Sequence, residues 1–238
     1  MIVKFSGKVV LVAGGTGGLG HAVSLAFLSE GAKVVVTYRN QKEFDALRSA
    51  AGTNGSSLEG RRVDVTDEAA VRELIDAVFA KYGRLDGLVN TVGGYAGGKN
   101  LWQTDAKVFD QMLTLNMRSG YVLARATVPA MVKQGFGAIV NIASKAAVDH
   151  AAGAAAYCFE SGRGGNDGFA RRRGQGHRGR VNSILPSIID TEINRKAIPK
   201  ADFAQWPKPE DIARVILFLC SDEAKVIHGA ALPVYGES

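Results

Sequence analysis

Short apolar runs alternate along the chain with longer segments in which apolar and polar positions recur at helical spacing. The runs predict buried strands, and the segments between them predict amphipathic helices. The seven predicted strands are Val9–Ala13, Lys33–Thr37, Arg61–Val65, Leu85–Asn90, Ala138–Ala143, Val181–Leu185 and Ala230–Val234. The predicted helices are His21–Glu30, Gln41–Ala51, Asp67–Tyr82, Asp105–Gln134 and Pro209–Ser221. This alternation predicts a single doubly wound α/β domain over residues 1–238, a parallel sheet of about seven strands with helices on both faces.

Individual residues refine the helix ends. Gly31 follows the first helix and is expected to close its carboxyl end. Thr66 is the expected N-cap of the helix at 67–82. Pro129 lies inside the segment Asp105–Gln134 and predicts a bend or a break there. Residues 52–57 are predicted to form a polar loop.

The composition excludes several classes of protein. The chain has 238 residues, 46% of them hydrophobic, which is too apolar for disorder throughout. Cys158 and Cys220 are the only thiols, so a disulfide scaffold is excluded and a reducing, cytoplasmic location is expected. No apolar stretch reaches the roughly 18 residues of a membrane helix, and the N-terminus has no signal-peptide cleavage pattern. The four histidines are scattered without metal-ligand spacing, so no metal site is predicted.

The positive charge of the chain is concentrated in one segment. The formal net charge is +6 and the sequence pI is about 9.4, values that are typical of nucleic-acid-binding proteins. Residues 161–180 alone hold 6 arginines, 1 aspartate and 7 of the 29 glycines. They carry +5, which leaves +1 for the rest of the chain. The basic character therefore belongs to a local segment.

A glycine cluster lies between the first predicted strand and the first predicted helix. Gly14, Gly18 and Gly20 follow the spacing G-x-x-x-G-x-G. Glycine lets the backbone turn tightly and approach a pyrophosphate, which the N–H groups and dipole of the helix N-terminus can hold. In this position the cluster predicts a Rossmann-like dinucleotide site, although an ordinary glycine-rich turn is the alternative. The residues expected to bind the cofactor here are Gly14, Thr16, Gly17, Gly18, Leu19 and Gly20.

The end of the second strand bears on the choice of cofactor. An acidic residue there would bind the ribose 2′-hydroxyl of NAD, but the sequence is Thr37-Tyr38-Arg39-Asn40. Arg39 can pair with a 2′-phosphate, so NADP(H) is favoured over NAD(H). The alternative is that Arg39 is simply a solvated residue at the strand end.

With these motifs the chain resembles the short-chain dehydrogenase/reductase family over nearly its whole length. Besides the glycine motif, Val89-Asn90-Thr91-Val92-Gly93 is similar to the family's N-N-A-G stretch, from which Thr91 and Val92 depart. Ser144 and Tyr157 are 13 positions apart, which suits the family's catalytic serine and tyrosine, and Pro186-Ser187 stands for its P-G turn. The resemblance implies further cofactor contacts from Asp64, Val65, Asn90, Gly93, Pro186, Ile189 and Thr191.

The resemblance implies hydride transfer between nicotinamide and a ketone or secondary alcohol, in the manner of oxoacyl reductases. Tyr157 would be the general acid/base, Ser144 would hydrogen-bond the substrate oxygen, and Asn116 would hold a water of the proton relay. The alternative is structural: a buried tyrosine, a strand-end serine and a helix-breaking asparagine. The resemblance also implies a homodimer or homotetramer. Substrate contacts are expected from 94–102 and 192–206, where Tyr95, Trp102 and Trp206 either line an apolar pocket or are ordinary surface or core aromatics.

The sequence departs from the family immediately after Tyr157. The family has Y-x-x-x-K, whereas this chain reads Tyr157-Cys158-Phe159-Glu160-Ser161, without the lysine. The glycines that follow each cost about 1 kcal/mol in a helix relative to alanine. Three explanations compete: an Arg/Gly-rich nucleic-acid-binding tract at 161–180, a catalytically inactive nucleotide-binding protein, and a frameshift in the recorded coding sequence at about 159–179.

The frameshift explanation can be examined from the residues. With synonymous codons chosen for the purpose and the first base of the Phe159 codon skipped, the segment translates as S-K-A-A-V-V-A-M-T. After one undetermined residue it continues S-L-A-E-E-V-K-A-T-G-V and reaches Arg180, where the family pattern resumes. This shifted text restores S-K after Tyr157 and has the pattern of an amphipathic helix. The frameshift is therefore the favoured explanation, and no nucleic-acid partner is expected.

Overall fold

Seven parallel strands form one sheet in the order β3-β2-β1-β4-β5-β6-β7. The computed structural model describes residues 4–149 and 178–237. The strand order reverses between β1 and β4, as it does in doubly wound sheets. The predicted fold class is therefore confirmed, whereas the extent of the domain over residues 1–238 stays a prediction. The strands are β1 (Val9–Ala13), β2 (Lys33–Tyr38), β3 (Leu58–Arg62), β4 (Gly87–Asn90), β5 (Phe136–Ile142), β6 (Arg178–Pro186) and β7 (Ala231–Val234).

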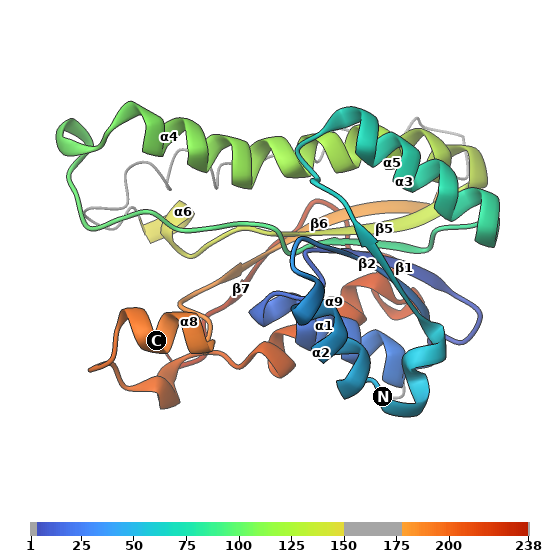
Figure 1. Ribbon diagram of the computed structural model, residues 1–238, viewed down its shortest axis with the longest axis horizontal. Helices are drawn as coiled ribbons and strands as arrows, with labels where there is room; N and C mark the ends of the chain where they lie inside the picture. Colours follow the sequence, from blue (N-terminus) through green and yellow to red (C-terminus); the bar gives the residue numbers. More distant parts are fainter. Residues whose placement is uncertain (1–3, 150–177, 238) are drawn as a thin grey trace.

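Helices cover both faces of the sheet (Figure 1). On one face lie α1 (Gly18–Ser29), α2 (Gln41–Ala50) and α9 (Pro209–Cys220). On the other face lie α3 (Glu68–Tyr82), α4 (Ala106–Met112) and α5 (Ser119–Gln134). Two short helices, α6 (Ala146–Asp149) and α8 (Glu192–Ala197), follow β5 and β6 at one edge of the sheet.

The central strands form the middle layer of the hydrophobic core. Every residue of β1 and β4 is buried, because helices cover both of their faces. Side chains of alternate orientation divide between two packed clusters. Val10 and Val12 pack with Phe27 and Ile216 on the α1 and α9 side, whereas Leu11 packs in the cluster of α3 and α5. Among the described residues, no helix is long and apolar enough to span a membrane.

The third strand lies three residues earlier than the sequence predicts. Residues 61–65 were expected to be extended because Val63 and Val65 alternate with charged residues, but β3 is Leu58–Arg62. Its register pairs Val34 with Leu58 and Tyr38 with Arg62. Because β2 ends at Tyr38, the residues after Arg62 have no partner strand. Val65 is buried all the same, since it packs in the α3 and α5 cluster.

The helix boundaries differ from the sequence predictions at two places. Asp67, not Thr66, caps α3, because its carboxylate accepts the N–H groups of Ala69 and Ala70 at 2.8 and 3.1 Å. Pro129 neither ends nor breaks its helix, since α5 continues through it to Gln134. The irregularity of the long helical region lies earlier, where a π-helical turn at Leu113–Arg118 joins α4 to α5. Such turns are frequent at functional sites.

A buried arginine fastens β6 to the end of α9. The guanidinium of Arg180 donates hydrogen bonds to the carbonyls of Leu219, Ala224 and Ser221 at 2.6, 2.9 and 2.8 Å. These carbonyls lie at and just after the carboxyl end of α9, where backbone acceptors lack intrahelical donors. Burial lowers the pKa of Arg180, but its three acceptors compensate for the desolvation of the charge.

We expect Arg180→Ala to lower the free energy of unfolding by about 2–4 kcal/mol, because it leaves three buried carbonyls without their donor. Urea denaturation followed by circular dichroism measures this change. The matched control is Arg214→Ala, which removes an exposed pair with Asp211 and is expected to change stability by about 0.5 kcal/mol or less. Equal losses in the two variants would contradict the structural role of Arg180.

Candidate active site

The predicted glycine turn adopts a conformation that excludes side chains. Gly14 has a φ of 72°, a left-handed value that glycine adopts without strain. A Cβ atom on Gly15 would lie 2.5 Å from Cγ1 of Val36, and one on Gly20 would overlap the carbonyl oxygen of Gly14. Glycine is therefore required here so that α1 can pack closely against β1 and β2.

Polar side chains from neighbouring strands hold this turn in place. The hydroxyl of Thr37 accepts the N–H of Gly14 at 2.9 Å. The hydroxyl of Thr91, which follows β4, donates to the carbonyls of Ala13 and Gly14 at 2.7 and 3.2 Å. From within α1, the buried Ser24 hydroxyl donates to the carbonyl of Gly15 at 3.0 Å. Sequence reasoning missed these positioning residues because the contacts join segments far apart in the chain.

The first turn of α1 faces the loop that follows β6. Its N-cap, Gly17, provides no capping side chain, and the turn contains no acidic residue. The first N–H groups of the helix have no intrahelical acceptors and carry the positive end of its dipole. A Cβ on Gly18 would lie 2.8 Å from Cγ2 of Thr191. The predicted pair Gly18 and Thr191 is thus brought together around a surface suited to an anion, and this geometry fits a pyrophosphate.

A hollow of about 350 Å³ lies beyond the ends of β2 and β3. Arg39 and Asp64 face each other across it, with 3.6 Å between Nη2 and Oδ1, and both side chains are more than half exposed. Hydrogen bonds from the backbone and hydroxyl of Thr66, and then the charge of Arg39, lower the pKa of Asp64. The hollow is lined by Arg39, Asp64, Thr66, Asp110, Gln111, Thr114 and Leu115.

The predicted Asn116 connects the π-helical turn to the loop after β4. Its Oδ1 accepts the N–H of Gly94 at 2.8 Å, and its Nδ2 donates to the carbonyl of Gly94 at 3.1 Å. A Cβ on Gly93 would lie 2.9 Å from the same Oδ1. Nearby, the buried Asn90 accepts the N–H of Val92 at 3.1 Å. The Asn116 amide therefore positions a loop through both of its polar atoms.

Ser144 lies just beyond the end of β5. Its Oγ accepts the N–H of Ala146 at 3.1 Å. The backbone on either side is fastened to the neighbouring strand β6, because Ala143 donates to Ile184 and Lys145 donates to Pro186 at 2.8 and 2.9 Å. The serine therefore occupies a defined position at the carboxyl edge of the sheet. Tyr157, its predicted catalytic partner, lies outside the described residues.

The segment after β6 is anchored to the C-terminal residues. Ser187 donates its hydroxyl to the carbonyl of Tyr235 at 2.7 Å, and the N–H of Asp190 bonds the carbonyl of Pro207 at 3.0 Å. The half-buried Ile189 packs against the α1 and α9 cluster. Thr191 then caps α8 by accepting the N–H of Asn194 at 3.3 Å. These bonds set the height of Thr191 above the glycine turn.

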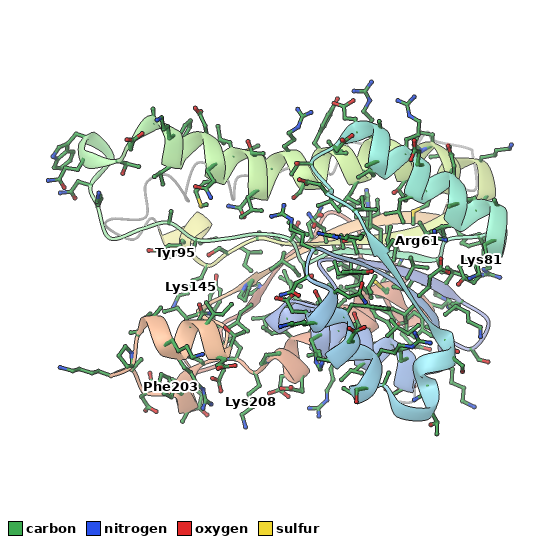
Figure 2. All side chains as sticks on the ribbon, in the orientation of Figure 1. Arg61, Lys81, Tyr95, Lys145, Phe203 and Lys208 are labelled. Atoms are coloured by element: carbon green, nitrogen blue, oxygen red, sulfur yellow. The ribbon has the colours of Figure 1, made fainter. Side chains whose placement is uncertain are left out.

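The three aromatic residues proposed for a substrate pocket have different environments. Tyr95 is 64% exposed and Trp102 is 81% exposed, whereas Trp206 is 7% exposed and packs against Phe203 with ring centroids 5.0 Å apart. Figure 2 shows Tyr95 and Phe203 on opposite sides of Lys145 at the carboxyl edge. Trp206 is thus a packing residue below the surface of the segment 192–206.

The described residues hold no group of three or more His, Cys, Asp or Glu side chains that could bind a metal ion. Cys220 is buried, and burial raises the pKa of its thiol to about 12. A thiol with so high a pKa is protonated at neutral pH and is a poor nucleophile.

The comparisons with known proteins agree with this geometry. The family model for short chain dehydrogenases matches residues 8–202. D-threitol dehydrogenase of Mycolicibacterium smegmatis is 34% identical, over 98% of this chain and 93% of that protein. The 3-oxoacyl-[acyl-carrier-protein] reductase FabG of Thermotoga maritima is 29% identical over 98% of both chains.

Solved structures agree as well. A short-chain type dehydrogenase/reductase from Mycobacterium ulcerans superposes with a TM-score of 0.89 and 26% identity, over 99% of this chain and 90% of that one. ElxO with NADP bound gives a TM-score of 0.87 and 28% identity, over 96% and 97% of the two chains. On this evidence the chain belongs to the short-chain dehydrogenase/reductase family of NAD(P)-dependent oxidoreductases.

Proposed function

We propose that this chain transfers hydride between NADP(H) and a ketone or secondary alcohol, with NADP(H) favoured over NAD(H). The observation that carries the proposal is the uncapped, glycine-rich N-terminus of α1, which is closed from above by Thr191. Ser144 follows β5 at the same carboxyl edge. Ligands of open α/β sheets bind at this edge, next to the point where the strand order reverses.

The residues around the glycine turn would hold the cofactor. Gly17, Gly18 and Leu19 would offer backbone N–H groups to the pyrophosphate, and Thr16 borders the same turn. Arg39 would pair with the 2′-phosphate, while Asp64 and Val65 would contact the adenine. Asn90, Gly93, Pro186, Ile189 and Thr191 would surround the nicotinamide half. The bound nicotinamide supplies or accepts the hydride.

Proton transfer would fall to the side chains beside the substrate. Tyr157 would exchange a proton with the substrate oxygen, although free tyrosine has a pKa near 10 and needs a neighbouring cation to act near neutral pH. Ser144 would donate a hydrogen bond to the same oxygen. Asn116 would support a water in the relay from its place on the π-helical turn, while its amide holds Gly94.

The substrate we propose is an aliphatic or acyl carbonyl compound, or the corresponding alcohol. The relatives are named for acyl-carrier-protein, polyol and cyclic diol substrates, which share a carbonyl or secondary alcohol carbon. We further propose a cytoplasmic homodimer or homotetramer that binds neither a membrane nor nucleic acid.

The missing lysine is the main obstacle to activity, and we propose that residues 159–179 record a frameshift. The relatives match this chain nearly from end to end, whereas the Y-x-x-x-K motif fails at Ser161. The second candidate function, an inactive nucleotide-binding protein, rests on the same absence. It applies if the protein carries the residues as written.

Replacing residues 159–179 by the frame-restored sequence is expected to raise kcat for NADPH-dependent reduction of an acyl ketone by about 100-fold or more, because Tyr157 regains a lysine. Steady-state absorbance at 340 nm measures the rate. Peptide mass spectrometry of the native protein gives an independent answer: the restored frame yields one long apolar tryptic peptide, whereas the written one yields very short fragments. Full turnover by a chain verified to carry the written residues would contradict the proposal.

Gly20→Ala is expected to weaken NADPH binding by about 10-fold or more, because the added methyl group displaces the Gly14 carbonyl and opens the anion site. Fluorescence titration of bound NADPH measures the dissociation constant. Gly55→Ala is the control, since its Cβ would lie at an ordinary 3.5 Å from the Arg48 carbonyl oxygen. Unchanged affinity in Gly20→Ala would place the cofactor elsewhere.

In the frame-restored chain, Ser144→Ala is expected to lower kcat by about 100-fold, because the substrate oxygen loses a hydrogen-bond donor in the transition state. The dissociation constant of NADPH is expected to stay within about twofold, since this serine contacts substrate rather than cofactor. The exposed Ser29→Ala serves as control. A variant that keeps its kcat would show that Ser144 is a strand-end residue without a catalytic role.

A further inference from the structure

Two donors beside the expected ribose position already have carboxylate partners. The hydroxyl of Thr16, in the glycine turn, donates to Oε2 of Glu43 at 3.1 Å. Arg39, just after β2, pairs with Asp64 at 3.6 Å. Both contacts span the region between the phosphate turn and the end of β2, where the 2′ group of a dinucleotide is recognised. Negative charge is therefore already present where a 2′-phosphate would bind.

Glu43 is held in this region by local structure. It lies in the first turn of α2, four residues after Arg39. Asn40 caps that helix by accepting the N–H of Lys42 at 3.0 Å, and the positive end of the helix dipole favours a carboxylate in its first turn. Glu43 is exposed, so nothing shields a bound ligand from its charge except water and salt.

The charge balance around Arg39 is unfavourable for a phosphate. Asp64 and Asp110 line the same hollow as Arg39, and Glu43 lies on the adjoining turn. Among the described residues that line this hollow, Arg39 is the single cation against two carboxylates. A 2′-phosphate would bring up to two further negative charges, whereas the 2′-hydroxyl of NAD(H) brings none.

We propose that Glu43 is a specificity-determining residue that weakens binding of the 2′-phosphate and so narrows the preference for NADP(H) over NAD(H). This inference rests on the proposed function, because it assumes that Arg39 faces the 2′ position. Cofactor choice is then a balance between Arg39, which attracts the phosphate, and Glu43, which opposes it.

The test compares adenosine 2′,5′-bisphosphate with adenosine 5′-monophosphate by calorimetric titration of the full chain. The two probes differ only in the 2′-phosphate, and neither requires catalysis. Glu43→Gln keeps an oxygen that can accept the Thr16 hydroxyl but removes the charge. We expect this variant to bind the bisphosphate about 3–10-fold more tightly in low salt, with a smaller gain at about 0.3 M salt, and to bind the monophosphate unchanged.

The matched control is Asp45→Asn, which makes the same charge change on the same helix. Asp45 is exposed and accepts a hydrogen bond from Nε2 of Gln41 at 2.8 Å. An equal gain in the control, or no gain in Glu43→Gln, would overturn the proposal for Glu43 while leaving the dinucleotide site intact. If neither probe binds the parent chain, the proposed function fails and this inference fails with it. Thermal melting of each variant confirms that it is folded.

Discussion

The close approach of α1 to β1 is the constraint on which the candidate site depends. Gly20 contacts the Gly14 carbonyl with no space for a methyl group, and Gly15 abuts Val36. This packing directs the first N–H groups of α1 toward the carboxyl edge of the sheet. A side chain at either glycine would push the helix away, so the backbone itself specifies the anion site.

Polar contacts from distant segments then fix the surroundings of that turn. Thr91 fastens it to the end of β4, and Asn116 holds the next loop through Gly94. The segment after β6 closes over Gly18 with Thr191. Each contact joins a loop to a strand or helix terminus, which is how a rigid sheet can position residues that lie on irregular backbone.

The sequence predicts the central fold well because strands buried on both faces are apolar along their whole length, as Val9–Ala13 is. It fails at β3, where an edge strand is only half buried and its limits depend on the length of β2. It also predicts the glycine turn and the position of Ser144, since glycine and strand ends leave local signals. The clamps made by Thr91 and Asn116, and the packing of Trp206, depend on partners far away in the chain. The side-chain pair Thr16 and Glu43 has no local signal at all.

The strand order also bears on how the chain folds during its synthesis. Residues up to Ile142 contain β1 to β5, which are adjacent in the finished sheet as β3-β2-β1-β4-β5. A ribosome therefore releases one contiguous half of the sheet, complete with its glycine turn, before it reaches the segment that departs from the family. Since domains form from the N-terminus during translation, an error encoded after residue 158 reaches a chain whose nucleotide half is already made. Damage to the message at that point removes the later strands and the proton-transfer residues while sparing the older half.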